Sequence, residues 1–246
     1  MKVNRKEIKR EARESMRAHR PSVYLVALVF LILIWVLDSL SFKLLHPGQS
    51  AQDIVDSYIA RQEAVQDALE NGDITGFVIE YEQTEPEPAT GARLIDLAIS
   101  IMNIMITAGF VLFCLNVSRN AEAGFGNLFD TFGIFFRVLW LHIVMGFFIF
   151  LWSLLLVVPG IIAGYRYSQA LYVLLDDPSK GALECIRESK EMMRGHKWQL
   201  FVLQLSFIGW AILSIIPFVG IYTEPYFRTT YANFYRAVSG REYCII

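Results

Sequence analysis

Apolar residues are gathered into long blocks, and the polar and charged residues are concentrated between them. A helix needs about 20 mainly apolar residues to cross the hydrocarbon core of a bilayer, and six blocks approach or exceed this length. We therefore predict an all-α fold, a polytopic transmembrane helical bundle of about six spans, which forms a single membrane domain over residues 1–246. The predicted spans are residues 21–45, 94–117, 134–158, 161–175, 198–216 and 218–238.

The segment before the first span is strongly basic, with eight Lys or Arg residues within positions 1–20. Asn4 is placed to cap a helix here, with Glu7 as its capping-box partner. The apolar positions Ile8, Ala12 and Met16 then share one face. Two interpretations are open: this cytoplasmic basic helix lies on anionic lipid, or its charges only fix the topology.

Residues 46–93 form an acidic extracytoplasmic loop, with ten carboxylates against two arginines. Such a loop can attract cations or a basic partner. It can equally be a solvated surface loop, because runs of like charge usually face water.

Residues 176–196 predict a cytoplasmic amphipathic helix between the fourth and fifth spans. Asp177 is a candidate cap before Pro178, and Gly195 is a candidate terminator. An apolar stripe of Leu183, Ile186 and Met193 lies opposite the basic positions Lys180, Arg187, Lys190 and Arg194.

The distribution of Lys and Arg sets the predicted orientation. Six alternating spans place most of these 22 residues on one side, whereas the other side receives only Lys43, Arg61 and Arg93. Because positive charge favours the cytoplasmic side, both termini are expected to be cytoplasmic. The first block is too long for the apolar region of a secretory signal and lacks a small-residue cleavage site, so we expect it to be a retained anchor.

The composition of the chain excludes several classes of protein. Hydrophobic residues make up 54% of the chain, and the mean hydropathy of +0.41 excludes a disordered protein. The net charge of −2 gives no general attraction to nucleic acid, and three cysteines do not make a disulfide scaffold.

No catalytic signature is present: the sequence lacks HExxH, GxSxG, P-loop and GxGxxG motifs. We therefore predict no catalytic residues, no metal site, no cofactor and no enzymatic activity. The adjacent Asp176 and Asp177 weakly resemble a metal–diphosphate site, and helix capping explains Asp177 more simply.

Ionisable residues inside spans are costly in hydrocarbon, so they face protein or a water-filled cavity. Arg166, Glu224 and Arg228 are predicted to form one buried polar cluster, with the last two at the i, i+4 spacing of a helical ion pair. Tyr222 and Tyr226 extend it, and Asp38 and Asp96 are further candidates for the same layer. The cluster is either a polar cavity for an anionic or zwitterionic ligand or a structural ion-pair network.

Two sets of polar residues accompany this cluster. The last span is expected to carry an inward-running stripe of Tyr222, Tyr226, Thr229, Thr230 and Asn233. The fourth span adds Tyr165, Tyr167, Ser168, Gln169 and Tyr172.

Several motifs resemble one family. They are Leu154-Leu-Leu-Val-Val-Pro159-Gly160-Ile-Ile, Asp176-Asp177-Pro178, Ala182-Leu183-Glu184-Cys-Ile186, Ser189-Lys190, Met193-Arg194-Gly195-His196-Lys197-Trp198, Leu205-Ser206-Phe207-Ile208-Gly209-Trp210 and, near the start, Asn4-Arg5-Lys6-Glu7-Ile8-Lys9. The chain is thereby similar to the uncharacterised bacterial integral membrane proteins catalogued as domain of unknown function nine-seven-five, over roughly residues 1–40 and 94–238. The resemblance implies a polytopic bacterial membrane protein and supplies no substrate, cofactor or catalytic residue.

Together these observations favour a non-enzymatic scaffold, accessory or regulatory protein of the bacterial cell membrane. The alternative is a small transporter or a lipid- or anion-binding protein that uses a cavity around Arg166, Glu224 and Arg228. Against transport, the two halves of the chain show no inverted repeat. The expected partners are membrane lipids and either a protein partner or a second copy in a homo-oligomer.

Overall fold

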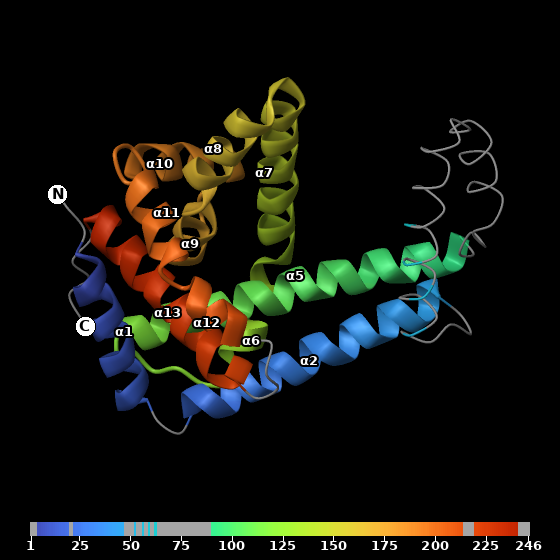
Figure 1. Cartoon of the computed structure of the whole chain (residues 1–246), viewed down its shortest axis with the longest axis horizontal. Coiled ribbons are helices and arrows are strands. Elements are labelled where there is room, and N and C mark those ends of the chain that lie inside the picture. The colour runs from blue at the N-terminus through green and yellow to red at the C-terminus, as the bar shows by residue number, and fades with distance from the viewer. Residues whose placement is uncertain are drawn as a thin grey trace. The chain divides into compact units, whose positions relative to one another are not determined.

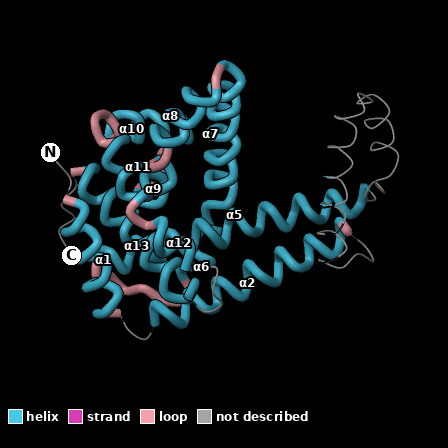
Figure 2. Tube along the Cα trace, in the orientation of Figure 1, coloured by secondary structure: helices cyan, strands magenta, loops and turns pink. Residues whose placement is uncertain are grey.

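The computed structural model describes residues 4–19, 22–46, 90–213 and 219–240, together with positions 52, 56, 59 and 62. Every element in this part of the chain is a helix, as the sequence predicts (Figures 1 and 2). Most of the acidic loop at residues 46–93 lies outside the described residues. The elements are α1 (Arg5–Ala18), α2 (Ser22–Leu45), α5 (Thr90–Ser118), α6 (Asn127–Asp130), the 3₁₀ helix η1 (Thr131–Ile134), α7 (Phe135–Leu155), α8 (Val157–Tyr167), α9 (Ala170–Asp176), α10 (Ala182–Met192), α11 (Lys197–Leu205), α12 (Ile208–Leu213) and α13 (Val219–Ser239).

The chain divides into two compact units. One comprises Met1–Ile34 with Ile101–Ile246, and the other comprises Trp35–Ser100. In the smaller unit Ser41 donates a hydrogen bond to Asp96, which joins α2 to α5. The candidate site described below lies within the larger unit.

Three helical stretches in the described residues are long and apolar enough to cross a membrane. They are Ser22–Leu45, Thr90–Ser118 and Asn127–Leu155, and they coincide with the first three predicted spans. This finding supports a membrane protein. The remaining blocks, 161–175, 198–216 and 218–238, stay predictions as spans, and the first two are not continuous helices.

The predicted span at 161–175 is broken between α8 and α9 by a side chain from α10. The Ser189 hydroxyl donates to the carbonyl oxygen of Arg166 at 2.8 Å and accepts from the backbone N–H of Gln169 at 3.2 Å. Both Ser189 and Gln169 are buried. A side chain that enters the i→i−4 ladder is a known cause of a sharp bend, so the expectation of one continuous helix was wrong here.

The predicted span at 198–216 is also broken, between α11 and α12. Ser206 turns its hydroxyl back to the carbonyl of Leu203 at 2.5 Å. The Ser206 carbonyl in turn accepts from Lys9 Nζ at 3.3 Å, and the same ammonium lies 4.0 Å from the centroid of the Phe207 ring. A cation at a helix C-terminus is favourable, so α1 stabilises this break.

The basic helix α1 packs against α13. Its predicted apolar face, Ile8, Ala12 and Met16, is buried, and the Asn233 side-chain amide donates to the carbonyl of Ile8 at 3.3 Å. Asn4 accepts from the backbone N–H of Lys6 at 3.2 Å, which confirms it as the N-cap. Because protein covers the apolar face, the structure disfavours the interpretation in which α1 lies on lipid through this face, whereas basic residues such as Arg5, Lys6 and Arg10 remain exposed on the other side.

The amphipathic helix α10 begins at Ala182, which is later than the start that we predicted from Asp177 as the cap. Asp177 instead accepts from the backbone N–H of Ser179 at 3.1 Å and from its hydroxyl at 2.5 Å, forming a turn ahead of the helix. Gly195 has φ +79° just beyond the helix, which fits its predicted role as terminator. Leu183 is 64% exposed, so it does not belong to the apolar face as expected. That face consists of Ala182, Cys185, Ile186 and Met193, with Ser189.

Helices α7 and α8 pack closely against each other, and Figure 1 shows α8 turning away from the end of α7 toward α10 and α9. Leu156 is extended between them. At Gly160 an added Cβ would lie 2.1 Å from Ser153 Oγ and 3.0 Å from Ser153 Cα, so the close approach favours glycine. The outer face of α7 is an exposed apolar stripe, the α7 stripe: Phe136, Trp140, Ile143, Phe147, Phe150 and Leu154.

Candidate functional site: a polar column on α13

Polar side chains lie on two opposite faces of α13. With 3.6 residues per turn, Glu224, Arg228, Tyr231 and Tyr235 share one face because they recur at i, i+4, i+7 and i+11. The stripe predicted from the sequence lies on the other side of the helix. Its members Tyr226, Thr229, Thr230 and Asn233 are buried, and Asn233 reaches α1.

At one end of the first face, Glu224 and Arg228 form the ion pair that their spacing predicts. Arg228 Nε donates to Glu224 Oε1 at 2.8 Å. The side chains of Glu224 and Arg228 are 28% and 33% exposed, respectively. Tyr231 follows Arg228 by three residues on the same face of α13. This end of the face is therefore charged, carries a phenol and is partly accessible.

At the other end the same face reaches a closed polar junction. The Asp176 side chain, at the end of α9, is only 1% exposed. It accepts from Arg119, which follows α5, and from the Tyr235 hydroxyl at 2.5 Å. Tyr172 stacks on Tyr235 with 5.2 Å between ring centroids. A carboxylate taken out of water needs such charged or hydrogen-bonded partners.

Arg236 secures the junction from one side by donating to the carbonyl of Ser118 in the last turn of α5. Asn120 then takes a positive φ of 54° as the chain leaves the helix. The guanidinium thus meets the negative end of the α5 dipole. The ends of α5 and α9 are both fastened to α13 at this point.

We call the set of seven residues the polar column: Glu224, Arg228, Tyr231, Tyr172, Tyr235, Asp176 and Arg119. From Glu224 to Tyr235 it follows α13 for about 16 Å at 1.5 Å per residue. That length is roughly half the hydrocarbon thickness of a bilayer. The column holds both signs of charge and three phenols, so it can bind a polar ligand or lock the order of the helices.

The structure brings together only part of the predicted site. Tyr222 and Tyr226 stack on each other at 5.8 Å, and Tyr226 meets the ring of Phe207 edge-on at 5.5 Å. Trp210 lies 5.8 Å from Tyr222. These two tyrosines therefore belong to an aromatic cluster on the face of α13 opposite the Glu224–Arg228 pair.

Arg166 is separate from the pair as well. It lies in the last turn of α8, where the helix dipole favours a cation. Among the described residues no hydrogen bond or ion pair joins it to Glu224 or Arg228. The single cluster of Arg166, Glu224 and Arg228 expected from the sequence is therefore not formed by direct contacts.

Sequence reasoning did not single out Tyr231, Tyr235 or Arg119, and it assigned Asp176 little weight. The spacing from Glu224 to Tyr235 was a usable signal, because it follows the helical period. No sequence signal connects Asp176 to Tyr235, which lies 59 positions away.

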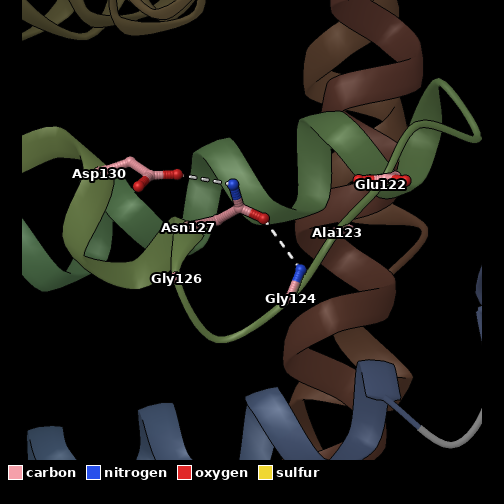
Figure 3. Close-up of a pocket in the computed structure, with 6 residues that line it drawn as sticks. All are labelled: Glu122, Ala123, Gly124, Gly126, Asn127 and Asp130. Carbon is pink, nitrogen blue, oxygen red and sulfur yellow. Dashed lines mark hydrogen bonds between the residues drawn. The ribbon is translucent and has the colours of Figure 1, made fainter.

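A separate shallow pocket of about 350 Å³ lies between the end of α5 and α6. Figure 3 shows how Asn127 shapes it: its Oδ1 accepts from the backbone N–H of Gly124 at 3.0 Å, and its Nδ2 donates to Asp130 at 2.8 Å. The pocket is lined by Glu122, Ala123, Gly124, Gly126, Asn127 and Asp130. None of the predicted site residues lies here, and the described part of the chain contains no group of three potential metal ligands.

The all-helical fold and the three apolar helices of spanning length among the described residues point to the class of helical membrane proteins. Residues 154–242 match the model of a family described as "Protein of unknown function (DUF975)", which confirms the resemblance over this segment. The segment includes α8 to α13 and hence most of the polar column. Outside residues 154–242 the resemblance remains a prediction. No curated protein and no solved structure matches the chain.

Proposed function

We propose that this chain is a non-enzymatic accessory protein of the bacterial cell membrane, which supports or regulates a partner through its lipid-embedded surface. One observation carries the proposal: the four charged residues of the polar column are paired with one another. Asp176 binds Arg119 and Tyr235, and Glu224 binds Arg228. Such pairing is expected of a network that fixes helix order.

The outward surface supports the same proposal. The α7 stripe presents large apolar side chains at alternating spacings of four and three residues. Lipid or another protein must cover this surface in a membrane. A partner would occupy one face of α7, whereas lipid would contact all exposed positions alike.

The test is photo-crosslinking in native membranes. A benzophenone amino acid replaces Phe147, which is 60% exposed, and in a matched control it replaces its neighbour Phe148, which packs near Tyr167 with 6.4 Å between ring centroids. We expect a discrete protein adduct of defined mass from position 147 and not from position 148. Adducts with lipid alone at 147 and at the other stripe positions would overturn the accessory role.

A second candidate, a lipid- or anion-binding protein, is favoured by the partial exposure of Glu224 and Arg228. Its ligand site would be this pair with Tyr172 and Tyr231. Of the other residues that the sequence placed in such a site, Tyr222 and Tyr226 stack in the aromatic cluster and Arg166 lies in the last turn of α8.

A further inference from the structure

The polar column is accessible at one end and closed at the other. Glu224 and Arg228 keep about a third of their side-chain surface exposed, whereas Asp176 keeps 1%. A conduit needs access at both ends, and a binding site needs access at one. The column therefore has the form of a one-ended site whose closed end holds three helices together.

The accessible end has unused binding capacity. The ion pair employs Nε of Arg228 and Oε1 of Glu224, so the two Nη groups and Oε2 are not part of it. The Nη groups form the planar fork that suits a phosphate. The second carboxylate oxygen can accept from an ammonium group.

The charge pattern selects the class of ligand. A simple anion at Arg228 would meet repulsion from Glu224, whose carboxylate is already 2.8 Å from the guanidinium. A molecule that carries a phosphate and an ammonium satisfies both side chains at once. The hydroxyl group of Tyr231, which follows Arg228 by three residues on the same face of α13, adds a donor for phosphate oxygens.

The membrane setting provides a reason for occupancy. Charged side chains that face hydrocarbon without cover are costly, and functional sites are where they persist. We propose that the Glu224–Arg228 pair binds a phosphate ester that bears a primary ammonium group, with the phosphate on Arg228 and the ammonium on Glu224. This chemistry is found in an amino-phospholipid headgroup and in soluble phosphoethanolamine.

Native mass spectrometry of the full chain in detergent tests the proposal. The probes are phosphatidylethanolamine, phosphatidylcholine and phosphatidylglycerol with identical acyl chains. We expect at least about tenfold tighter binding of phosphatidylethanolamine, equivalent to about 1.4 kcal/mol, because the quaternary ammonium of phosphatidylcholine has no N–H for Glu224. Equal binding of the three lipids would overturn the assignment.

Variants of Glu224 and Arg228 test which side chain binds the ammonium group and which binds the phosphate. Glu224→Gln should remove the preference for phosphatidylethanolamine over phosphatidylcholine, and Arg228→Gln should remove specific binding of both. The matched control is mutation of a second i, i+4 ion pair, Arg10 with Glu14 on the exposed face of α1. It should change neither the lipid preference nor the specific binding. A preference that survives in Glu224→Gln would refute the proposal.

A further variant and a competitor complete the test. Arg228→Lys keeps the charge but loses the fork, so it should weaken phosphatidylethanolamine binding about tenfold in a chain that elutes and melts as the wild type does. This variant keeps the test decisive if Glu224→Gln does not fold. Displacement of the lipid by soluble phosphoethanolamine would identify a soluble zwitterion as the ligand, and its failure would identify the lipid.

The inference rests on the proposed membrane setting and is independent of the accessory role. Photo-crosslinking at Phe147 probes a different surface from the Glu224–Arg228 pair. If Glu224→Gln loses the lipid preference and retains the protein adduct, both proposals stand. If the adduct is absent and the preference is present, only the accessory role fails.

Discussion

Asp176→Asn removes the charge of a nearly inaccessible carboxylate and keeps its shape. The aspartate accepts from the Arg119 guanidinium and from the Tyr235 hydroxyl, 2.5 Å away. An asparagine has one acceptor oxygen and an amide N–H₂ that only donates, so it can replace the carboxylate toward Arg119 or toward Tyr235 but not toward both. The Arg119 charge is left without its carboxylate at a place where only 19% of its side chain is exposed.

The magnitude follows from the loss of one partner of a buried ion pair. Such a change typically costs about 3–5 kcal/mol, and the partial exposure of Arg119 points to the lower end, about 3 kcal/mol. For a chain of this size each kcal/mol shifts the melting temperature by about 2–4 °C. We therefore expect Asp176→Asn to melt about 6–12 °C below the wild type.

The assay is thermal unfolding in detergent, followed by size-exclusion chromatography of the heated samples. The matched control is Asp177→Asn at the next position. Asp177 is 43% exposed, and its contacts with Ser179 and Lys180 are to residues within three positions along the chain, so its replacement should cost about 1 kcal/mol or less. Equal shifts for the two variants would refute the view that the Asp176 junction fastens α5 and α9 to α13.

Gly109→Ala is expected to lower the melting temperature, because its methyl carbon would lie 2.2 Å from a backbone carbonyl oxygen of α6. Gly146→Ala, which would place a methyl group with nothing within 4 Å, should raise the melting temperature slightly through its higher helix propensity. Thermal melts of the two variants, measured side by side, check both expectations. Burial raises the pKa of the Cys185 thiol to about 11. In a variant that keeps Cys185 as its single cysteine, a maleimide at about pH 8 should therefore label the unfolded chain and not the folded chain. In the control, a single cysteine at the exposed position 183 should be labelled in the folded chain. Burial, and then two neighbouring arginines, lower the pKa of Lys9 from 10.5. The unfolded chain therefore holds this proton more tightly, and the free energy of unfolding should rise as the pH increases through the lowered pKa toward 10.5. Denaturant titrations should show no such rise for Lys9→Met.

The sequence was sufficient where the signal is local. Three long apolar blocks became three helices of spanning length, and Asn4 caps α1 as its position predicts. The i, i+4 spacing of Glu224 and Arg228 gave the observed ion pair. In each case the interacting groups lie within one helix, so periodicity or spacing contains the information.

The sequence was insufficient where one helix is shaped by another. The break after α8 depends on Ser189, which is 23 positions from Arg166. The carbonyl freed after α11 is taken by Lys9, 197 positions before Ser206. By hydropathy both segments are apolar runs. A hydropathy profile contains no information about a hydroxyl or ammonium group that a distant part of the chain supplies.

The candidate site shows the same division. Tyr222 and Tyr226 have the residue type expected of a polar cavity, yet they stack in an aromatic cluster. Their position relative to Glu224 along a 3.6-residue period places them on the opposite face, which sequence alone could have shown. The closure of the column at Asp176 needed the packing of three helices and could not be derived from spacing.

The hydroxyl of Ser189 also sets an order of events during synthesis. The bend between α8 and α9 frees a carbonyl at Arg166 and an N–H at Gln169, and both are satisfied by this one side chain. Residue 189 is made about 1–4 s after residue 169 at typical translation rates of about 5–20 residues per second. During that interval these two atoms need water or another polar group as a partner. The bend between α8 and α9 is therefore complete only once α10 has been made and has packed against it.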